Sequence, residues 1–365
     1  MKKIVSILCM LALILSLVSL AACGRQELPD TSGETKQITQ NPEDTSAATQ
    51  NSGTSQPESS ATTEPQTPAG PAEMKIAALK GPTGMGLAKL MQDAADGKTK
   101  NSYTFELLSD PTTVSAAVIK GEVDIACVPV NLASTLYAKT NGEYICLAIN
   151  TLGVLHILEN GNTVQSIADL AGKTLYATGQ GSTPEYILNY ILTKNGIADQ
   201  VTVEYKTEHS ELAALLAAGS VTLGMLPEPN VSSAMAQNAD LRAALDLTAE
   251  WDKVCETSAV QGCVIINKAF AAENTDAVEA FMEEYAASVA FCSESVSEAA
   301  ALCETFGIVP KAAIAQKAYP NCNIVFITGE EMKASLSAFL EVLYEANPAS
   351  IGGALPEDDF YYTAK

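Results

Sequence analysis

The hydrophobic and polar positions of the chain divide it into three parts. An almost uninterrupted apolar stretch, residues 4–20, follows two lysines at the N-terminus. Residues 24–73 contain almost no large apolar side chains, and Asp, Glu, Ser, Thr, Gln, Pro and Gly dominate them. From Met74 to Lys365, short apolar runs alternate with segments of helical period, which predicts strands alternating with helices. This part, at about 300 residues, can hold a large core, and chains of such length commonly divide into two lobes.

An internal repeat predicts the architecture of the globular part. VSAAVIKGEVDIACVP (114–129) and LAALLAAGSVTLGMLP (212–227) both read as a helix, a glycine, an apolar strand and a proline. Three pairs of residues share an offset of 98: Gly81 and Gly179, Gly121 and Gly219, and Pro129 and Pro227. Alternation of strands and helices indicates parallel βαβ units with right-handed crossovers. We therefore predict an α/β fold of two lobes, each a mostly parallel sheet flanked by helices, with a ligand cleft between them.

The segments outside the repeat complete the predicted order of elements. The apolar run ICLAINTLGVLHI (145–157) is interpreted as one strand that crosses between the lobes. A further strand is expected at 262–270, followed by helices at 277–292 and 329–347. The first lobe is thus expected to take back the C-terminal third of the chain.

The N-terminal 22 residues read as an export signal. A basic start, an apolar stretch and small residues before Cys23 fit a cleaved signal peptide. The sequence Leu-Ala-Ala-Cys resembles the lipobox of bacterial lipoproteins, which implies that Cys23 becomes the lipid-modified N-terminus. An ordinary signal peptide and an uncut anchor are the alternatives, although a spanning helix needs about 20 apolar residues. The resemblance implies a lipoprotein held at the outer face of the cytoplasmic membrane, with the lipid bilayer as a partner.

The polar segment that follows Cys23 lacks the apolar side chains needed to offset its ordering entropy, and we expect a disordered tether. O-glycosylation is an alternative role for its Ser, Thr and Pro content. The expected divisions are 1–22 (signal peptide), 23–73 (tether), 74–152 (first part of lobe 1), 153–256 (lobe 2) and 257–365 (return to lobe 1 and C-terminal helices).

Charge and cysteine content exclude several classes of function. The formal net charge is −22 and no Lys/Arg cluster appears, so nucleic acid is not an expected partner. Seven cysteines follow Cys23, without any C-x-x-C spacing, so neither a disulfide framework nor a metal site is indicated. A bridge between Cys255 and Cys263 stays open as a possibility. No cofactor is expected.

Two loops carry the candidate binding chemistry. The stretch LKGPTGMGLAKL (79–90) matches the start of a phosphate-binding loop, but Leu87 and Ala88 replace the required Lys and Ser/Thr. The loop at Gly179 occupies the equivalent place in the second copy. Glycines there would allow backbone N–H groups at a helix start to face an acceptor on a ligand. The alternative is that each loop is a helix cap and nothing more.

Enzyme motifs are absent from the sequence. His156 lies in an apolar run and His209 precedes a helix, and no H-E-x-x-H or G-x-S-x-G occurs. We therefore expect a protein that is not an enzyme.

The segments together resemble the substrate-binding lipoproteins of ABC importers. Within that class, KGEVDIACVPVN and SIADLAGKTL followed by GQGST are similar to the nitrate/sulfonate/taurine (thiamine-pyrimidine-precursor-like) family, whose members have the type 2 periplasmic-binding-protein fold. The resemblance implies a monomer that closes its lobes on a small solute and delivers it to membrane permease subunits. It also implies these ligand contacts: Lys80, Pro82, Thr83, Gly84, Met85, Pro129, Asn131, Asn150, Thr151, Gln180, Gly181, Ser182, Thr183, Glu228 and Asn230.

The class of solute stays open in the sequence. Sulfonate or nitrate recognition calls for arginine or several N–H donors, and none of the expected loops contains arginine. Glu228 would suit an amine or a pyrimidine, or would be a solvated loop charge. The alternatives to a transport receptor are a pyrimidine-precursor-synthesising enzyme of the same fold and a surface interaction lipoprotein without transport.

Overall fold

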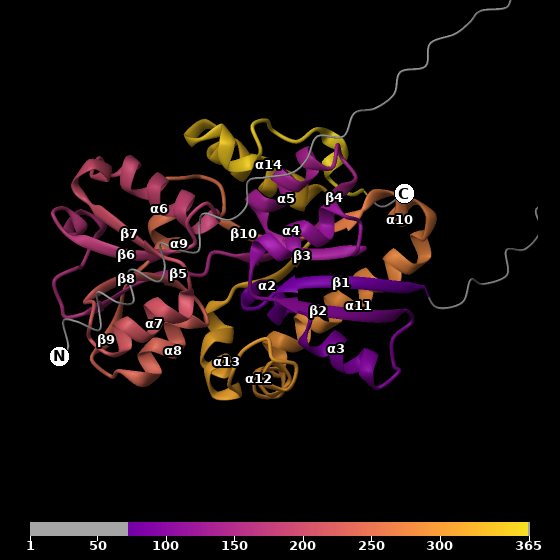
Figure 1. Ribbon diagram of the computed structural model, residues 1–365, viewed down its shortest axis with the longest axis horizontal. Helices are drawn as coiled ribbons and strands as arrows, with labels where there is room; N and C mark the ends of the chain where they lie inside the picture. Colours follow the sequence, from indigo (N-terminus) through magenta and orange to yellow (C-terminus); the bar gives the residue numbers. More distant parts are fainter. Residues whose placement is uncertain (1–71, 364–365) are drawn as a thin grey trace, which may run out of the picture. The chain divides into compact units, whose positions relative to one another are not determined.

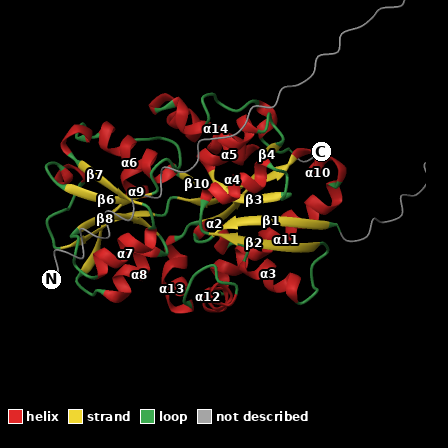
Figure 2. Cartoon of the chain, viewed as in Figure 1, coloured by secondary structure: helices red, strands yellow, loops and turns green. Residues whose placement is uncertain are grey.

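The computed structural model describes residues 72–363 of the chain (Figure 1). The predicted signal peptide, Cys23 and almost all of the predicted tether lie outside the described residues. Within residues 72–363, no helix is long and apolar enough to cross a membrane. This part of the chain contains two β-sheets, each with helices on both faces (Figure 2).

The first sheet combines the start of the described chain with segments near its end. Its strands are β1 (Glu73–Leu79), β2 (Ser102–Leu108), β3 (Ile125–Pro129), β4 (Tyr144–Leu152), β10 (Val260–Asn267) and β11 (Ile324–Ile327). They lie in the order β11-β4-β10-β3-β1-β2. β1 pairs in parallel with β2 and β3, whereas β10 is antiparallel to β3 and β4. The carboxyl ends of β1, β2 and β3 therefore lie at one edge.

The second sheet is formed by the middle of the chain. Its strands are β5 (Leu155–Asn160), β6 (Thr174–Thr178), β7 (Thr202–Lys206), β8 (Leu223–Pro227) and β9 (Leu241–Asp246). They lie in the order β7-β6-β8-β5-β9, and β6 is parallel to both β7 and β8. We call the first sheet with its helices the first lobe and the second sheet with its helices the second lobe.

The helices connect and cover these sheets. The helices that precede β10 are α2 (Pro82–Met85), α3 (Ala88–Ala95), α4 (Pro111–Ile119), α5 (Val130–Lys139), α6 (Thr183–Lys194), α7 (His209–Ala217), α8 (Asn230–Gln237) and α9 (Leu247–Trp251). The later ones are α10 (Lys268–Glu273), α11 (Thr275–Glu294), α12 (Val296–Thr305), α13 (Ala312–Ala318) and α14 (Gly329–Ala346). Short 3₁₀ turns are η1 (Ile167–Leu170), η2 (Ala198–Gln200), η3 (Tyr319–Asn321), η4 (Pro348–Ile351) and η5 (Asp358–Phe360).

The two lobes are copies of one arrangement. The order β2-β1-β3 in the first sheet repeats as β7-β6-β8 in the second. Helix α7 begins and ends 98 residues after α4, and strand β8 begins and ends 98 residues after β3. The glycines that precede β3 and β8, Gly121 and Gly219, both have a left-handed backbone, with φ of 66° and 69°. The predicted two-lobe α/β fold is confirmed.

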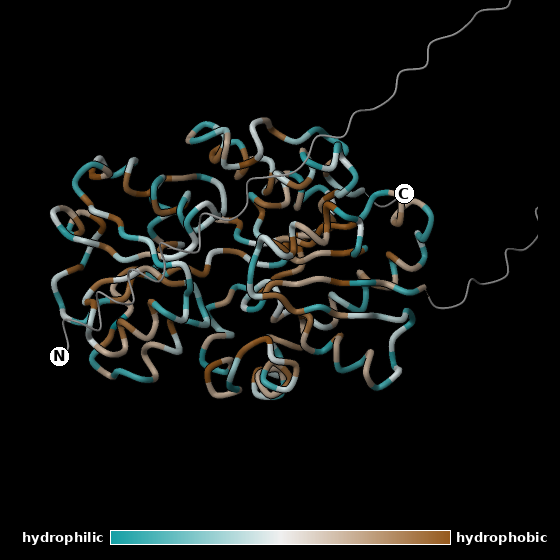
Figure 3. Tube along the Cα trace, in the orientation of Figure 1, coloured by the Kyte–Doolittle hydropathy of each residue, from teal (hydrophilic) through white to brown (hydrophobic). Residues whose placement is uncertain are grey.

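Three apolar cores hold the sheets and helices together. One core extends over a face of both sheets and includes side chains of α4, α5, α6 and α14. A second core lies between the first sheet and α3, α11 and α12, and a third lies between the second sheet and α7 and α8. Trp251 is fully buried between Tyr190 of α6 and Phe339 of α14, with ring centroids 4.8 and 5.4 Å away. Both sheets accordingly carry long hydrophobic stretches (Figure 3).

Two predicted features of the strands need correction. The apolar run 145–157 is not one strand, because β4 ends at Leu152 in the first sheet and β5 begins at Leu155 in the second. Between them Gly153 lies against α9, where an added Cβ would be 2.1 Å from Thr248 Oγ1. The C-terminal third also contains the short strand β11, which the sequence analysis did not predict, at an edge of the first sheet.

Candidate functional site

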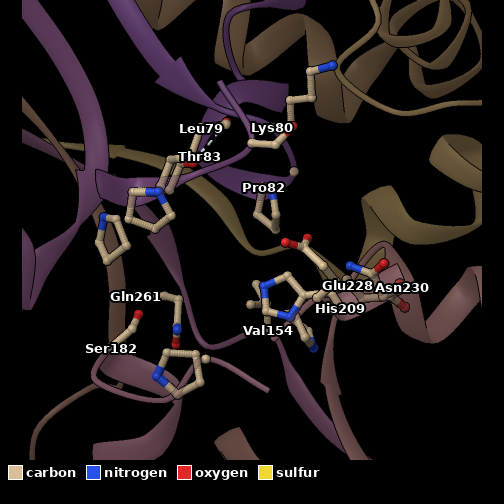
Figure 4. A pocket seen from close by; sticks show the side chains of 18 of the residues that line it. Leu79, Lys80, Pro82, Thr83, Val154, Ser182, His209, Glu228, Asn230 and Gln261 are labelled. Atoms are coloured by element: carbon tan, nitrogen blue, oxygen red, sulfur yellow. Dashed lines mark hydrogen bonds between the residues drawn. The ribbon is translucent and has the colours of Figure 1, made fainter. Parts of the chain in front are cut away.

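A cavity of about 610 Å³ lies at the carboxyl ends of the parallel strands, with lining residues from both lobes (Figure 4). The first lobe contributes the loop after β1, the loop after β2 and the end of β3. The second lobe contributes the corresponding positions after β6, β7 and β8. The duplication thus brings six equivalent loops together, at the edge where ligands bind in parallel α/β sheets.

Many of the residues expected to contact a ligand line this cavity. They are Lys80, Pro82, Thr83, Pro129, Thr151, Gln180, Ser182, Glu228 and Asn230. The residues expected at the site that do not line it are Gly84, Met85, Asn131, Asn150, Gly181 and Thr183. Ligand contact by any residue of the first group stays a prediction.

The residues outside the cavity have structural contacts instead. Met85 is fully buried, and its backbone oxygen accepts a hydrogen bond from the Tyr319 hydroxyl at 3.3 Å. A Cβ added at Gly84 would lie 2.6 Å from the backbone oxygen of Leu79, so only glycine fits there. Asn150 is fully buried and donates to the backbone oxygen of Thr83 at 3.2 Å. These contacts hold the segment after β1 in place without facing the cavity.

Asn131 and Thr183 join the two lobes. The Thr183 N–H and hydroxyl donate to Asn131 Oδ1 at 3.2 and 2.9 Å, and Asn131 Nδ2 donates to the Gly181 oxygen at 3.4 Å. The Gly181 N–H is hydrogen-bonded to the Glu185 carboxylate, and the Ser182 N–H is hydrogen-bonded to the Gly179 oxygen. These N–H groups at the start of α6 are therefore not free to bind a ligand. The backbone donors expected to face the ligand are therefore bonded within the protein.

Glu228 is the buried charge of the cavity. Its residue is 1% exposed, and its carboxylate lies at the cavity wall near Pro82 and Asn230 (Figure 4). The carboxylate accepts from the Ser232 N–H at 3.1 Å and the Ser232 hydroxyl at 3.0 Å. Burial raises the pKa of Glu228 despite these hydrogen bonds.

His209 is the first residue of α7 and lines the same cavity. Its Nδ1 is 2.7 Å from the hydroxyl of Thr178, at the end of β6. Burial lowers the pKa of His209 to about 4, so the imidazole is neutral at pH 7. A neutral imidazole next to a hydroxyl offers the cavity a hydrogen-bonding group without adding a positive charge.

Two further polar residues that line the cavity each carry a buried atom without a hydrogen-bond partner among residues 72–363. Gln261, in β10, is 8% exposed, and its Oε1 is buried and unpaired. The hydroxyl of Tyr205, in β7, is likewise buried and unpaired. Buried polar atoms are nearly always hydrogen-bonded in proteins, so such atoms at a cavity wall indicate a place for a ligand or water.

Part of this wall is not among the residues expected from the sequence. The loops after β2 and β7, which contribute Ser109 and His209, follow predicted strands, and ligands bind at the carboxyl ends of such strands, so these loops could have been predicted. Gln261 had no such signal, because it lies on the antiparallel strand β10 that returns from the second lobe. The seven described cysteines are free, so the structure contains no bridge between Cys255 and Cys263. No cluster of potential metal ligands occurs among residues 72–363.

Comparison with solved structures identifies the class of fold. An ABC transporter from Parabacteroides distasonis superposes with a TM-score of 0.69 at 22% identity, covering 80% of this chain and 100% of that one. The periplasmic aliphatic sulphonate binding protein SsuA from Escherichia coli gives 0.65 at 17%, covering 81% and 93%. The periplasmic nitrate-binding protein NrtA from Synechocystis PCC 6803 gives 0.53 at 12%, covering 76% and 82%. The chain has the two-lobe fold of these binding proteins.

The sequence itself matches a family model described as menaquinone biosynthesis over residues 85–345. The chain therefore belongs to that family. A comparison with curated proteins gave no match.

Proposed function

We propose that this protein is an extracytoplasmic solute-binding lipoprotein of an ABC importer. The observation that carries the proposal is the cavity formed by equivalent loops of two duplicated lobes, whose lining residues Gln261 and Tyr205 each have a buried polar atom without a hydrogen-bond partner among the described residues. A volume of about 610 Å³ suits a small organic molecule, since ligand pockets range from about 300 to 1,000 Å³.

Features outside the cavity support the same role. The solved structures with this fold include sulphonate- and nitrate-binding proteins. The lipobox-like sequence ending at Cys23 supports an anchor at the outer face of the cytoplasmic membrane, and the polar segment after it would let a monomer reach permease subunits. In this proposal the lobes close on the solute and deliver it to the permease.

Ligand-dependent stability tests the proposal directly. The purified chain is heated with panels of sulfonates, nitrate, aromatic acids, pyrimidines and amines, and the melting temperature is followed. A ligand at a hundredfold excess over its Kd stabilises by about 2.7 kcal/mol, because it binds the folded state alone. A compound that raises the melting temperature must lose this effect when Ser182 is replaced by a bulky residue that fills the cavity. If no compound class stabilises the protein, the proposal of solute binding is wrong.

An enzyme of menaquinone biosynthesis is the second candidate. The family description favours it, and Glu228 and His209 place two proton-transferring side chains at one cavity. The same stabilising compound separates the candidates when it is incubated with the protein for hours and then analysed by mass spectrometry. An unchanged compound supports the receptor, and conversion that requires Glu228 or His209 supports the enzyme.

A further inference from the structure

The charges around the cavity are unevenly distributed between its mouth and its wall. The charged lining residues are Lys80, Asp110, Lys206, Glu208 and Glu228. Lys80, Asp110 and Glu208 are exposed, and the Lys206 ammonium lies 5.5 Å from the Tyr176 ring centroid. Glu228 is thus the charged lining residue that is removed from water.

Glu228 has no lysine or arginine partner in the described part of the protein. Its hydrogen bonds come from Ser232 and, at 3.5 Å, from Asn321 Nδ2, all of them neutral donors. No lysine or arginine of residues 72–363 forms an ion pair with it. His156 lies on the neighbouring strand β5, where a positive charge on its imidazole would lower the pKa of Glu228, but it forms no hydrogen bond with the carboxylate. A buried carboxylate without a counterion is costly, and a cation bound next to it would remove that cost.

Apart from the lining residues Lys80 and Lys206, the same wall has few groups that would bind an anion. Arg242, the arginine of the described residues, pairs with Glu159 away from the cavity. The N–H groups of Gly181, Ser182 and Thr183 at the start of α6 are bonded within the protein. At the start of α8 the Ser232 N–H is bonded to Glu228 itself. A sulfonate or nitrate normally needs several such donors or an arginine, and it would also meet the Glu228 carboxylate.

We propose that the cavity binds a cationic nitrogen ligand, an ammonium or amidinium group on a compact apolar or aromatic body, and discriminates against sulfonates and nitrate. This inference rests on the proposed solute-binding function and specifies its ligand. The N–H groups of the ligand donate to the Glu228 carboxylate and to the unpaired Gln261 Oε1. The protein therefore differs in ligand class from the sulphonate- and nitrate-binding proteins that share its fold.

The remaining wall suits the apolar body of such a ligand. Proline rings from both lobes line the cavity, among them Pro82, Pro129, Pro184 and Pro229, together with Val154. Figure 4 shows Pro82 and Val154 in the same close-up as Glu228, His209 and Gln261. Because proline rings are rigid, they form flat apolar surfaces against which an aromatic or alkyl group can pack at a low entropic cost.

Matched probes on the parent protein test the inference without any substitution. Benzamidine and benzenesulfonate share a ring and differ in charge, and butylammonium and butanesulfonate form an alkyl pair. We expect the two cations to raise the melting temperature of the full chain and to bind in calorimetry, and we expect the two sulfonates and nitrate to do neither. Binding of a sulfonate or nitrate in preference to the cations overturns the inference but leaves solute binding intact. Failure of every probe of both charges to bind contradicts solute binding as well.

Substitutions then locate the bound cation. Glu228→Gln keeps the shape of the side chain and should weaken binding of the cationic probe about ten- to hundredfold, since a charged hydrogen bond is lost. Gln261→Leu removes the second acceptor and should weaken it less. Glu298→Gln is the matched control, because Glu298 is an exposed carboxylate in α12 that does not line the cavity. This substitution should leave the affinity unchanged. Equal affinity of the parent and Glu228→Gln for the cations would overturn the inference.

Discussion

Asn131 of the first lobe accepts two hydrogen bonds from Thr183 of the second lobe, one from its backbone N–H at 3.2 Å and one from its hydroxyl at 2.9 Å. Asn131 is 5% exposed and Thr183 is fully buried. Asn131 also donates to the backbone oxygen of Ser350, in η4, at 3.3 Å. The contact therefore ties the start of α6 to the first lobe, next to the ligand cavity.

Replacement of Asn131 by alanine should loosen the contact between the lobes. The change leaves the Thr183 N–H and hydroxyl buried without an acceptor, which costs about 1–3 kcal/mol of unfolding free energy. Chemical denaturation measures this loss, and small-angle X-ray scattering should show a larger radius of gyration in the ligand-free state. Asn189→Ala, at an exposed position of α6, is the matched control and should change neither quantity. An unchanged stability of Asn131→Ala would show that the contact contributes nothing.

Gly262 of β10 forms the floor beneath the loop after β1. A Cβ added there would lie 2.5 Å from Thr83 Cγ2 and 2.8 Å from Asn150 Oδ1. Gly262→Ala should therefore destabilise the protein by about 1–3 kcal/mol in chemical denaturation, as overpacking of a core does. Adding Thr83→Ser removes the nearest methyl group and should restore part of the loss. If the double variant is as unstable as the two single effects added together, the clash with Thr83 is not the cause.

The repeat explains why the fold was accessible from sequence. Gly121 and Gly219 have left-handed backbones that favour glycine, and each precedes an apolar strand that ends in a proline, at Pro129 or Pro227. These local requirements leave a visible residue type at a fixed offset, so the duplication and the edge that carries the ligand loops could be predicted.

The chemistry of the cavity depends on contacts between residues that are distant in the sequence, so less of it could be predicted from the sequence. The N–H and hydroxyl of Thr183 at the start of α6 are occupied because Asn131 reaches them from 52 positions away. Gln261 enters the wall only because β10 inserts between β3 and β4. No local sequence pattern indicates the contact between Asn131 and Thr183 or the position of Gln261, since both depend on how distant segments pack together. The candidate residues could be named from loops, but their hydrogen-bonding state could not.

Glu228→Gln should stabilise the ligand-free protein at neutral pH. The pKa of the Glu228 carboxyl is raised above 4.5 by burial, so the folded parent holds its proton more tightly than the unfolded chain does. The unfolding free energy of the parent should therefore fall relative to that of Glu228→Gln as the pH rises from about 4.5 through the raised pKa. Above that window we expect a gain of about 1 kcal/mol for the variant, equivalent to about 2–4 °C in melting temperature.

Melting curves of the parent and Glu228→Gln at several pH values between 4 and 8 measure this difference. Glu298→Gln serves as the control, because an exposed carboxylate should give a difference that does not vary with pH in this way. A Glu228→Gln variant that is less stable than the parent at pH 7, and equally stable at pH 4, would contradict the expected sign.

His209 should make the protein sensitive to acid in the opposite direction. Burial lowers the pKa of this imidazole from 6.5 to about 4, so the unfolded chain takes up a proton before the folded protein does. The stabilising contribution of the neutral side chain is complete above pH 6.5 and is lost as the pH falls toward 4. The chain has two histidines, so His156→Gln leaves a single imidazole whose NMR titration reports on His209. We expect that signal to titrate near pH 4, and His209→Gln should reduce the slope of stability against pH between 6.5 and 4. A titration midpoint near 6.5 would mean that His209 is solvated and not a neutral part of the cavity wall.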